Sequence, residues 1–402
     1  MRQWLLTWAR SWRTWACLFC VAVATGLAGF WLWTESHLRA AQRALDHRAF
    51  AKAEAHLDRY FRVWPHSEEA HLLAARCARL KGDFATAARH LDEYEQLAAD
   101  RDVLTLERYL IDAQRGTLSP AQMKVLRQRS LSNGPDSPHI LEALALGFIY
   151  TNRLGEAKET VDYWLALTPG ESQPLFLRGL VWEGMGNPDN AGQDYRDAIR
   201  RDPQHVPARK RLAEHLLLTH RYGEAAELFD TLLREEPHDA ALRLGRARCH
   251  RHQGETAEAE ALLDALVADD APLVAALVER ARIAQVKEAF ADADKWYRQA
   301  LALDPFDSDA CFGLARCLRH QGKVSEAKHF EARWEAIERD AKRLKELHAH
   351  IATHPTDIES AFEAGTICQR NGQREEARRW FRNVLQRDAH HAGAREALEE
   401  MN

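Results

Sequence analysis

The chain has 402 residues, too many for one ordinary hydrophobic core, so several domains or a repeat architecture must divide it. Its formal net charge is −5, which argues against a basic nucleic-acid-binding protein, and we expect no nucleic-acid partner. The seven cysteines are odd in number and scattered, so they form no disulfide framework.

The N-terminus begins with a short basic and aromatic tail over residues 1–14, which holds Arg2, Arg10 and Arg13 and no acid. Residues 15–33 then run for 19 residues without a charge, with tryptophans at both ends. As a helix this stretch is about 28 Å long, close to the hydrocarbon thickness of a bilayer. Indole rings favour the headgroup level, so the pattern predicts one transmembrane helix over 15–33.

The side of the membrane follows from the charges that flank this helix. Three arginines precede it, and the positive-inside rule places the N-terminus in the cytoplasm. Residues 35–402, with a net charge of −8, are then expected on the extracytoplasmic, periplasmic-like side of a single-pass inner or plasma membrane. The alternative is a signal peptide cleaved after the small residues 22–24, which would release a secreted protein.

A 34-residue period runs through the rest of the chain. Prolines recur at this spacing, and glycine or asparagine recurs between them where one helix ends and the next begins. A repeat of this length is typical of stacked helix pairs. The clearest marks are alanines at successive 34-residue steps, namely Ala157, Ala191, Ala225, Ala259, Ala293 and Ala327.

The unit 172–205 shows the full pattern, with Gly179 on the first helix and then Ala191, Tyr195 and Ala198 on the second, before Pro203. This pattern resembles the tetratricopeptide repeat family. The resemblance implies an all-α fold, a right-handed α-solenoid of antiparallel helix pairs, here preceded by one transmembrane helix. It also implies a protein that binds other proteins or peptides.

The period also divides the chain. Residues 35–135 are expected to form N-terminal repeat-like units that are partly degenerate, before a turn-rich break at 130–138. The main array is expected over 138–402, with a terminal capping helix at 390–402. A long helix near 324–351 carries a continuous apolar stripe, which either packs on the next unit or serves self-association.

Catalytic signatures are absent from the sequence. It has no glycine-rich phosphate loop, no Gly-x-Ser-x-Gly and no His-Glu-x-x-His. Histidines that are close in sequence, such as His348 and His350, point apart on a helix and cannot easily share a metal. We therefore expect no enzyme, no catalytic residue, no cofactor and no metal.

Charge is distributed unevenly between the two helices of each unit. First helices, which line the concave groove in arrays of the family it resembles, are basic here, whereas residues 255–270 of a second helix carry six acids and no base. Arginine binds carboxylates through two hydrogen bonds, so an acidic segment or a C-terminal carboxylate is the expected ligand. The alternative is that the arginines pair with neighbouring acids such as Glu279, Asp307 and Asp309. The candidate groove residues are Arg76, Arg248, Arg251, Arg282, Arg316 and Arg319.

These observations favour a membrane-anchored scaffold that binds proteins or peptides through its concave groove. The second interpretation is a structural accessory subunit of a membrane complex that uses its outer face. An enzyme with an unrecognised site is the least favoured class, because it has no motif in its support.

Overall fold

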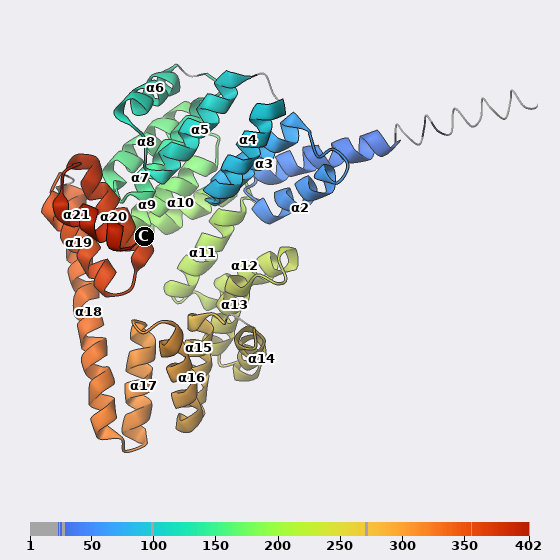
Figure 1. The fold of residues 1–402 in the computed structure, drawn as a ribbon. Coiled ribbons are helices and arrows are strands. Elements are labelled where there is room, and N and C mark those ends of the chain that lie inside the picture. The colour runs from blue at the N-terminus through green and yellow to red at the C-terminus, as the bar shows by residue number, and fades with distance from the viewer. Residues whose placement is uncertain are drawn as a thin grey trace, which may run out of the picture. The chain divides into compact units, whose positions relative to one another are not determined.

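The computed structural model describes residues 23, 25, 29–97, 100–132, 134–269, 272–354 and 356–401. Regular structure in these ranges is helical throughout (Figure 1). The predicted tail over 1–14 and most of the predicted membrane segment over 15–33 lie outside the described residues. Among the described helices, none combines the length and the apolar character that crossing a bilayer requires.

The chain forms two compact units, residues 1–111 and 112–402. The boundary between them falls in the sequence within the helix Arg101–Arg115, upstream of the turn-rich break at 130–138. The first part of that helix places Leu104 and Ile111 in the core of unit 1. Its last turn belongs to unit 2. There a Cβ added at Gly147 would lie only 1.9 Å from the carbonyl oxygen of Ala113, so the two helices approach closely.

Unit 1 is a stack of helix pairs. The helix over residues 29–46 packs with the next two helices around Ala41, Leu57 and Ala74. A second cluster joins the last helices around Ala87 and Leu91. After 29–46, the helices are α2 (Phe50–Phe61), α3 (Glu68–Lys81), α4 (Phe84–Leu97) and α5 (Arg101–Arg115).

Unit 2, taken by itself, is also a stack of helix pairs and has the all-α solenoid architecture that the period predicts (Figure 1). Its helices are α6 (Pro120–Leu131), α7 (Ser137–Tyr150), α8 (Leu154–Leu167), α9 (Gln173–Gly184), α10 (Pro188–Arg201), α11 (Val206–Leu218), α12 (Tyr222–Glu235), α13 (Ala240–Gln253), α14 (Thr256–Val267), α15 (Val274–Val286), α16 (Phe290–Leu303), α17 (Ser308–His320), α18 (Val324–Thr353), α19 (Ile358–Arg370), α20 (Arg374–Arg387) and α21 (Ala392–Glu400).

The periodic small residues lie where two helices cross. All six alanines of the 34-residue series are fully buried. On the facing helices, a Cβ at Gly313 would lie 2.1 Å from the ring of Tyr297, and one at Gly245 would lie 2.3 Å from the ring of Phe229. The aromatic ring therefore fills the space that the glycine leaves, which explains why both residue types recur with the repeat.

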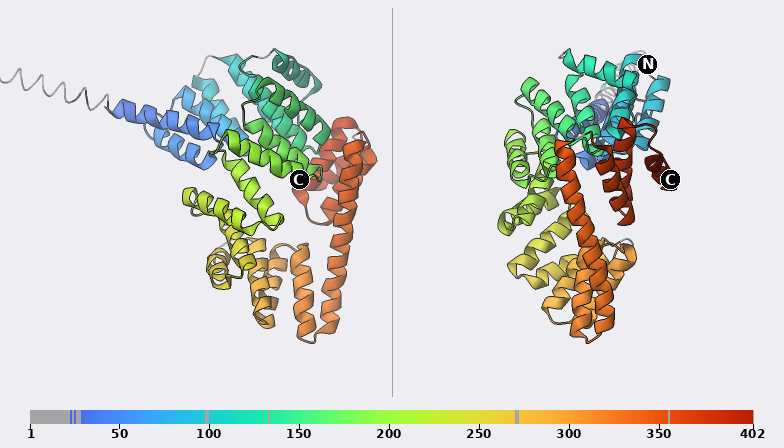
Figure 2. Two further views of the ribbon diagram at one scale, coloured as in Figure 1. Left: turned by 180° about the vertical axis from the view of Figure 1, so that it is seen from behind. Right: turned by 90° about the vertical axis from the view of Figure 1, so that its left-hand side faces the viewer.

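The helix α18 is 30 residues long and links two hydrophobic cores (Figure 2). Its first half packs Phe330, Trp334 and Ile337 against the core of α15–α17. Its second half buries Leu347 and Ile351 in the core of α19–α21. The apolar stripe that the sequence assigns either to packing or to self-association thus contacts helices of the same chain at both ends.

Candidate functional site

Three of the predicted groove arginines converge on one carboxylate. Arg248 and Arg251 extend from α13, and Arg282 lies on α15, one turn from Glu279. Nε of Arg248 donates to Oε1 of Glu279 at 3.1 Å, Nε of Arg251 to Oε2 at 2.7 Å, and Nη1 of Arg282 to Oε1 at 2.8 Å. The cluster therefore joins the first helices of two successive units.

The electrostatics of this arginine cluster leave an excess of positive charge. Burial alone would raise the pKa of Glu279, whose side chain is 2% exposed, but the three arginines outweigh burial and lower it. Arg282 also binds Asp309 on α17 at 2.6 Å. Three cations thus face two carboxylates, and the arginines remain 21–33% exposed. The cluster can still attract an anion at its surface.

Unit 1 repeats the same contact. Nε of Arg76 donates to Oε1 of Glu107 at 2.6 Å, and Nε of Arg79 donates to Oε2 at 3.2 Å. The arginines precede their acid by 31 and 28 residues, as Arg248 and Arg251 precede Glu279. The predicted groove residue Arg76 is therefore part of a recurring link between first helices.

The last two predicted arginines lie on α17 in different surroundings. Nη2 of Arg319 donates to Oε2 of Glu331 at 2.6 Å. Arg316 is exposed, and its guanidinium lies 5.7 Å from the ring centre of Phe312. Phe312 is itself 41% exposed and contacts Trp334 at 5.0 Å between ring centres. Within the described part of the chain, Arg316 makes no ion pair, so its charge faces solvent above an aromatic surface.

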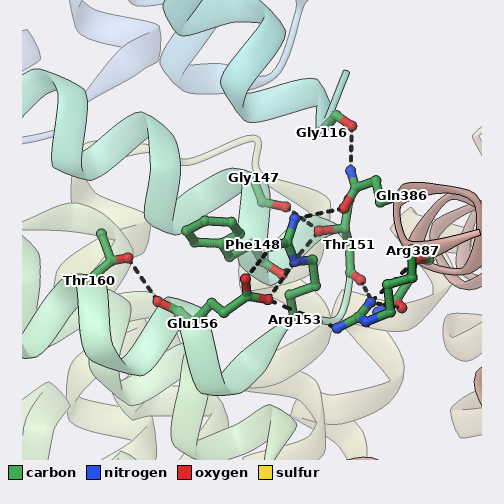
Figure 3. A network of polar contacts seen from close by, with 10 residues as sticks. Gly116, Gly147, Phe148, Thr151, Arg153, Glu156, Thr160, Gln386 and Arg387 are labelled. Atoms are coloured by element: carbon green, nitrogen blue, oxygen red, sulfur yellow. Dashed lines mark hydrogen bonds and ion pairs between the residues drawn. The ribbon is translucent and has the colours of Figure 1, made fainter. Parts of the chain in front are cut away.

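A second feature of unit 2 is a seam where α20 meets the α7–α8 turn (Figure 3). Nδ2 of Asn383 donates to the buried carbonyl of Thr151 at 2.7 Å, and Nη1 of Arg382 donates to the hydroxyl of Tyr150 at 2.6 Å. Arg153 donates to Oε1 of Gln386 at 2.9 Å, as Figure 3 shows. Because these partners are more than 230 residues apart, the array of unit 2 turns back on its own beginning.

A cavity of about 590 Å³ lies at the seam. Its wall mixes an aromatic pair, His348 and Trp380, with arginines and four glutamates. Arg153 and Arg387 both approach Glu156, and the four glutamates of the wall outnumber its two arginines. In the ranges that the structure describes, no three side chains of histidine, cysteine, aspartate or glutamate are grouped so that they could hold a metal ion.

Sequence reasoning identified the basic residues of the first helices but not the seam. The seam residues Asn383 and Gln386 fall in an ordinary amphipathic second helix, and Thr151 precedes a routine turn. Their roles depend on which units meet in space. No spacing or motif in the sequence could have indicated this contact.

Comparison with protein families finds tetratricopeptide repeat models. One such model matches residues 184–234, 216–281 and 287–351, and another matches residues 38–102. A comparison with curated protein sequences gives no match.

Solved structures with a similar arrangement include a tetratricopeptide repeat protein from Parabacteroides merdae, with 18% identity over 71% of this chain and 98% of that one, and a TM-score of 0.37. The type IV pilus biogenesis factor PilW shares 20% identity over 50% of this chain and 94% of that one, with a TM-score of 0.45. The human IFIT1 dimer shares 14% identity over 87% of this chain and 89% of that one, with a TM-score of 0.47.

Proposed function

Because this chain is a tetratricopeptide repeat protein, we propose that it is a non-enzymatic scaffold that binds an acidic or C-terminal segment of a partner protein. The observation that carries the proposal is the exposed guanidinium of Arg316 above Phe312, on the first helix that follows the arginine cluster. A carboxylate can bind this guanidinium while an apolar neighbour covers the ring.

In this proposal the predicted groove residues have two roles. Arg248, Arg251 and Arg282 hold Glu279 and provide long-range attraction through their excess charge. Arg316 provides direct contact, because a ligand does not have to displace a carboxylate to reach it. Substitution of Arg316 therefore tests recognition with the least risk to the fold.

We expect the substitution Arg316→Glu to weaken the binding of an acidic peptide at least tenfold, because it replaces an attractive contact of about 1–2 kcal/mol with a repulsive one. The probe is a fluorescein-labelled octapeptide of glutamate and leucine, titrated by anisotropy against the full chain in detergent at low and physiological salt. Wild-type binding should weaken as salt rises.

The matched control is Lys295→Glu, which reverses a charge that is 74% exposed on the second helix α16. This variant should bind the peptide as the wild type does. Equal affinity of wild type and Arg316→Glu would refute the proposed contact. Loss of binding in the control alone would indicate recognition by the outer face.

We further propose that residues 15–33 tether the scaffold to a membrane, with residues 35–402 on the extracytoplasmic side. The support is the uncharged 19-residue stretch and the exposed side chains of Phe30, Trp31, Leu32 and Trp33, which are 47–58% exposed on the helix over 29–46. Aromatic side chains of this kind favour the membrane interface.

Deletion of residues 15–33 is expected to move the protein from the membrane fraction to the supernatant after carbonate extraction. An alkaline phosphatase fused after residue 60 should be active, because that enzyme works only outside the cytoplasm. A mature N-terminus near residue 25, seen by mass spectrometry of the intact protein, would contradict the tether and favour a cleaved signal peptide.

A further inference from the structure

Unit 1 contains two pairs of histidines whose rings face each other through the same nitrogen. Nδ1 of His37, on the helix over 29–46, lies 2.9 Å from Nδ1 of His56 on α2. Nδ1 of His71 on α3 lies 3.1 Å from Nδ1 of His90 on α4. The two members of each pair are 19 residues apart, and the second pair follows the first by 34 residues. One contact therefore recurs in two successive helix pairs.

The geometry of each pair allows a single proton between the two rings. Two imidazole nitrogens at this distance form an N–H···N hydrogen bond only when one donates and the other accepts. In the second pair the direction is fixed, because Nε2 of His71 lies 2.9 Å from the carbonyl oxygen of Pro65 and must donate to it. A neutral His71 then accepts at Nδ1, and His90 donates. Protonation of both rings would place two N–H groups and two positive charges face to face.

The surroundings oppose that double protonation. His37 and His71 are 8% and 7% exposed, Trp33 contacts His37 edge-on, and Phe61 lies against His71 and His90. The nearby charges are mainly cationic: Arg43 and Arg59 act on the first pair, and Arg89 acts on the second, with Glu93 opposing it. Burial, then the partner histidine, then these arginines lower the pKa of both His56 and His90.

We propose that the two histidine pairs are an acid-sensitive switch in unit 1, which opens the helix pairs 29–46/α2 and α3/α4 when both members of a pair become protonated. The contact is intact at neutral pH, where one Nδ1–H group in each pair donates to the Nδ1 of the other ring. Below about pH 6, the range in which histidines take up protons, charge repulsion separates the rings. This property is independent of peptide binding by unit 2.

The direction of the pH effect on stability follows from the difference in pKa between the folded and the unfolded chain. His56 and His90 have a lower pKa in the folded chain than in the unfolded chain, where it is about 6.5. Their contribution to stability is therefore fully present above about pH 6.5 and is lost as the pH falls below it. For each histidine that the fold keeps neutral, the equilibrium constant for opening increases about tenfold for each pH unit below about 6.5.

Hydrogen exchange measured by mass spectrometry on the full chain in detergent tests this switch between pH 7.5 and 5.0. After correction for intrinsic exchange rates, peptides over 29–61 and 68–97 should lose about tenfold protection per pH unit below 6.5. Peptides over 274–303, which hold no histidine, should keep theirs. The double variant His56→Gln/His90→Gln should lose the acid response, because glutamine keeps a hydrogen-bonding group and does not titrate.

The control His66→Gln changes an exposed histidine of the same unit and should respond as the wild type does. If the double variant lacks protection already at pH 7.5, the single variants decide: each should abolish the response only in its own helix pair. An unchanged pH response in the glutamine variants would overturn the proposal. So would a rise in protection when zinc is added at pH 7.5, since the pairs would then be metal ligands.

Discussion

Replacement of Glu279 by alanine is expected to destabilise the α13–α15 region by about 2–3 kcal/mol. The substitution leaves three arginines without the carboxylate that neutralises them, and removing one partner of a fully buried ion pair costs about 3–5 kcal/mol. We take a smaller value because the arginines are 21–33% exposed, so water recovers part of the loss. The measurement is local hydrogen-exchange protection over residues 240–286.

The pH response of this variant provides a second readout. The arginines lower the pKa of Glu279, so its contribution to stability is present above about pH 4.5, the usual value for a glutamate, and is lost only as the pH falls below it. Protection in the wild type should therefore decline in that acid range. In Glu279→Ala that part of the decline should be missing.

The matched control is Glu258→Ala, which removes an exposed glutamate from α14. It should change protection over residues 240–286 by less than about 0.5 kcal/mol. If both alanine variants were equally stable, the arginine cluster would contribute nothing to the fold. All three arginines would then be as available to ligands as Arg316.

The arginine cluster shows what the repeat period could and could not predict. The period assigns Arg248 and Arg282 to equivalent positions, and they lie on the first helices α13 and α15. Equivalent residues of stacked units face the same way. It did not predict that Glu279 would collect three arginines. That contact depends on how far one first helix is displaced along its neighbour, a distance that packing determines.

The sequence contains a pattern that indicates the histidine pairs, although no prediction above used it. His71 follows His37 by 34 residues, and His90 follows His56 by 34 residues, so the repeat itself marks both pairs. A search for histidines that are close in sequence does not find them, because the two members of each pair lie on different helices. Equivalent polar residues in two successive units are therefore informative in a repeat protein.

The seam of unit 2 could not be predicted in this way. Whether the end of an array meets its beginning depends on a small rotation per repeat, summed over many units. The long helix α18 changes that sum, because it inserts extra turns between two cores. The contact between Asn383 and Thr151 is thus a result of the whole array rather than of a local motif.

Substitution of Asn383 by aspartate is expected to open this seam. Asn383 is 1% exposed, and its amide donates to the carbonyl of Thr151 at 2.7 Å. Aspartate would instead direct one carboxylate oxygen toward that carbonyl oxygen, while its other oxygen keeps the contact with Nη1 of Arg387. Leaving the buried carbonyl of Thr151 without its donor costs about 1–3 kcal/mol, and Arg387 compensates the new negative charge, so about 2 kcal/mol is expected. Such a change shifts the balance between closed and open arrays about thirtyfold.

Pulsed electron–electron double resonance measures this opening as the distance between spin labels at the exposed positions 159 on α8 and 374 on α20. In the labelled protein, Cys17 and Cys20 are replaced by serine. The described cysteines are buried, and burial raises the thiol pKa of each of them, so they react slowly with the label. The parent chain should give one narrow distance distribution, and Asn383→Asp a broader and longer one. The control Asn190→Asp, an exposed position on α10, should leave the distribution unchanged. A narrow distribution in Asn383→Asp would mean that the other seam contacts, such as Arg382 with Tyr150, hold the array closed without the buried amide.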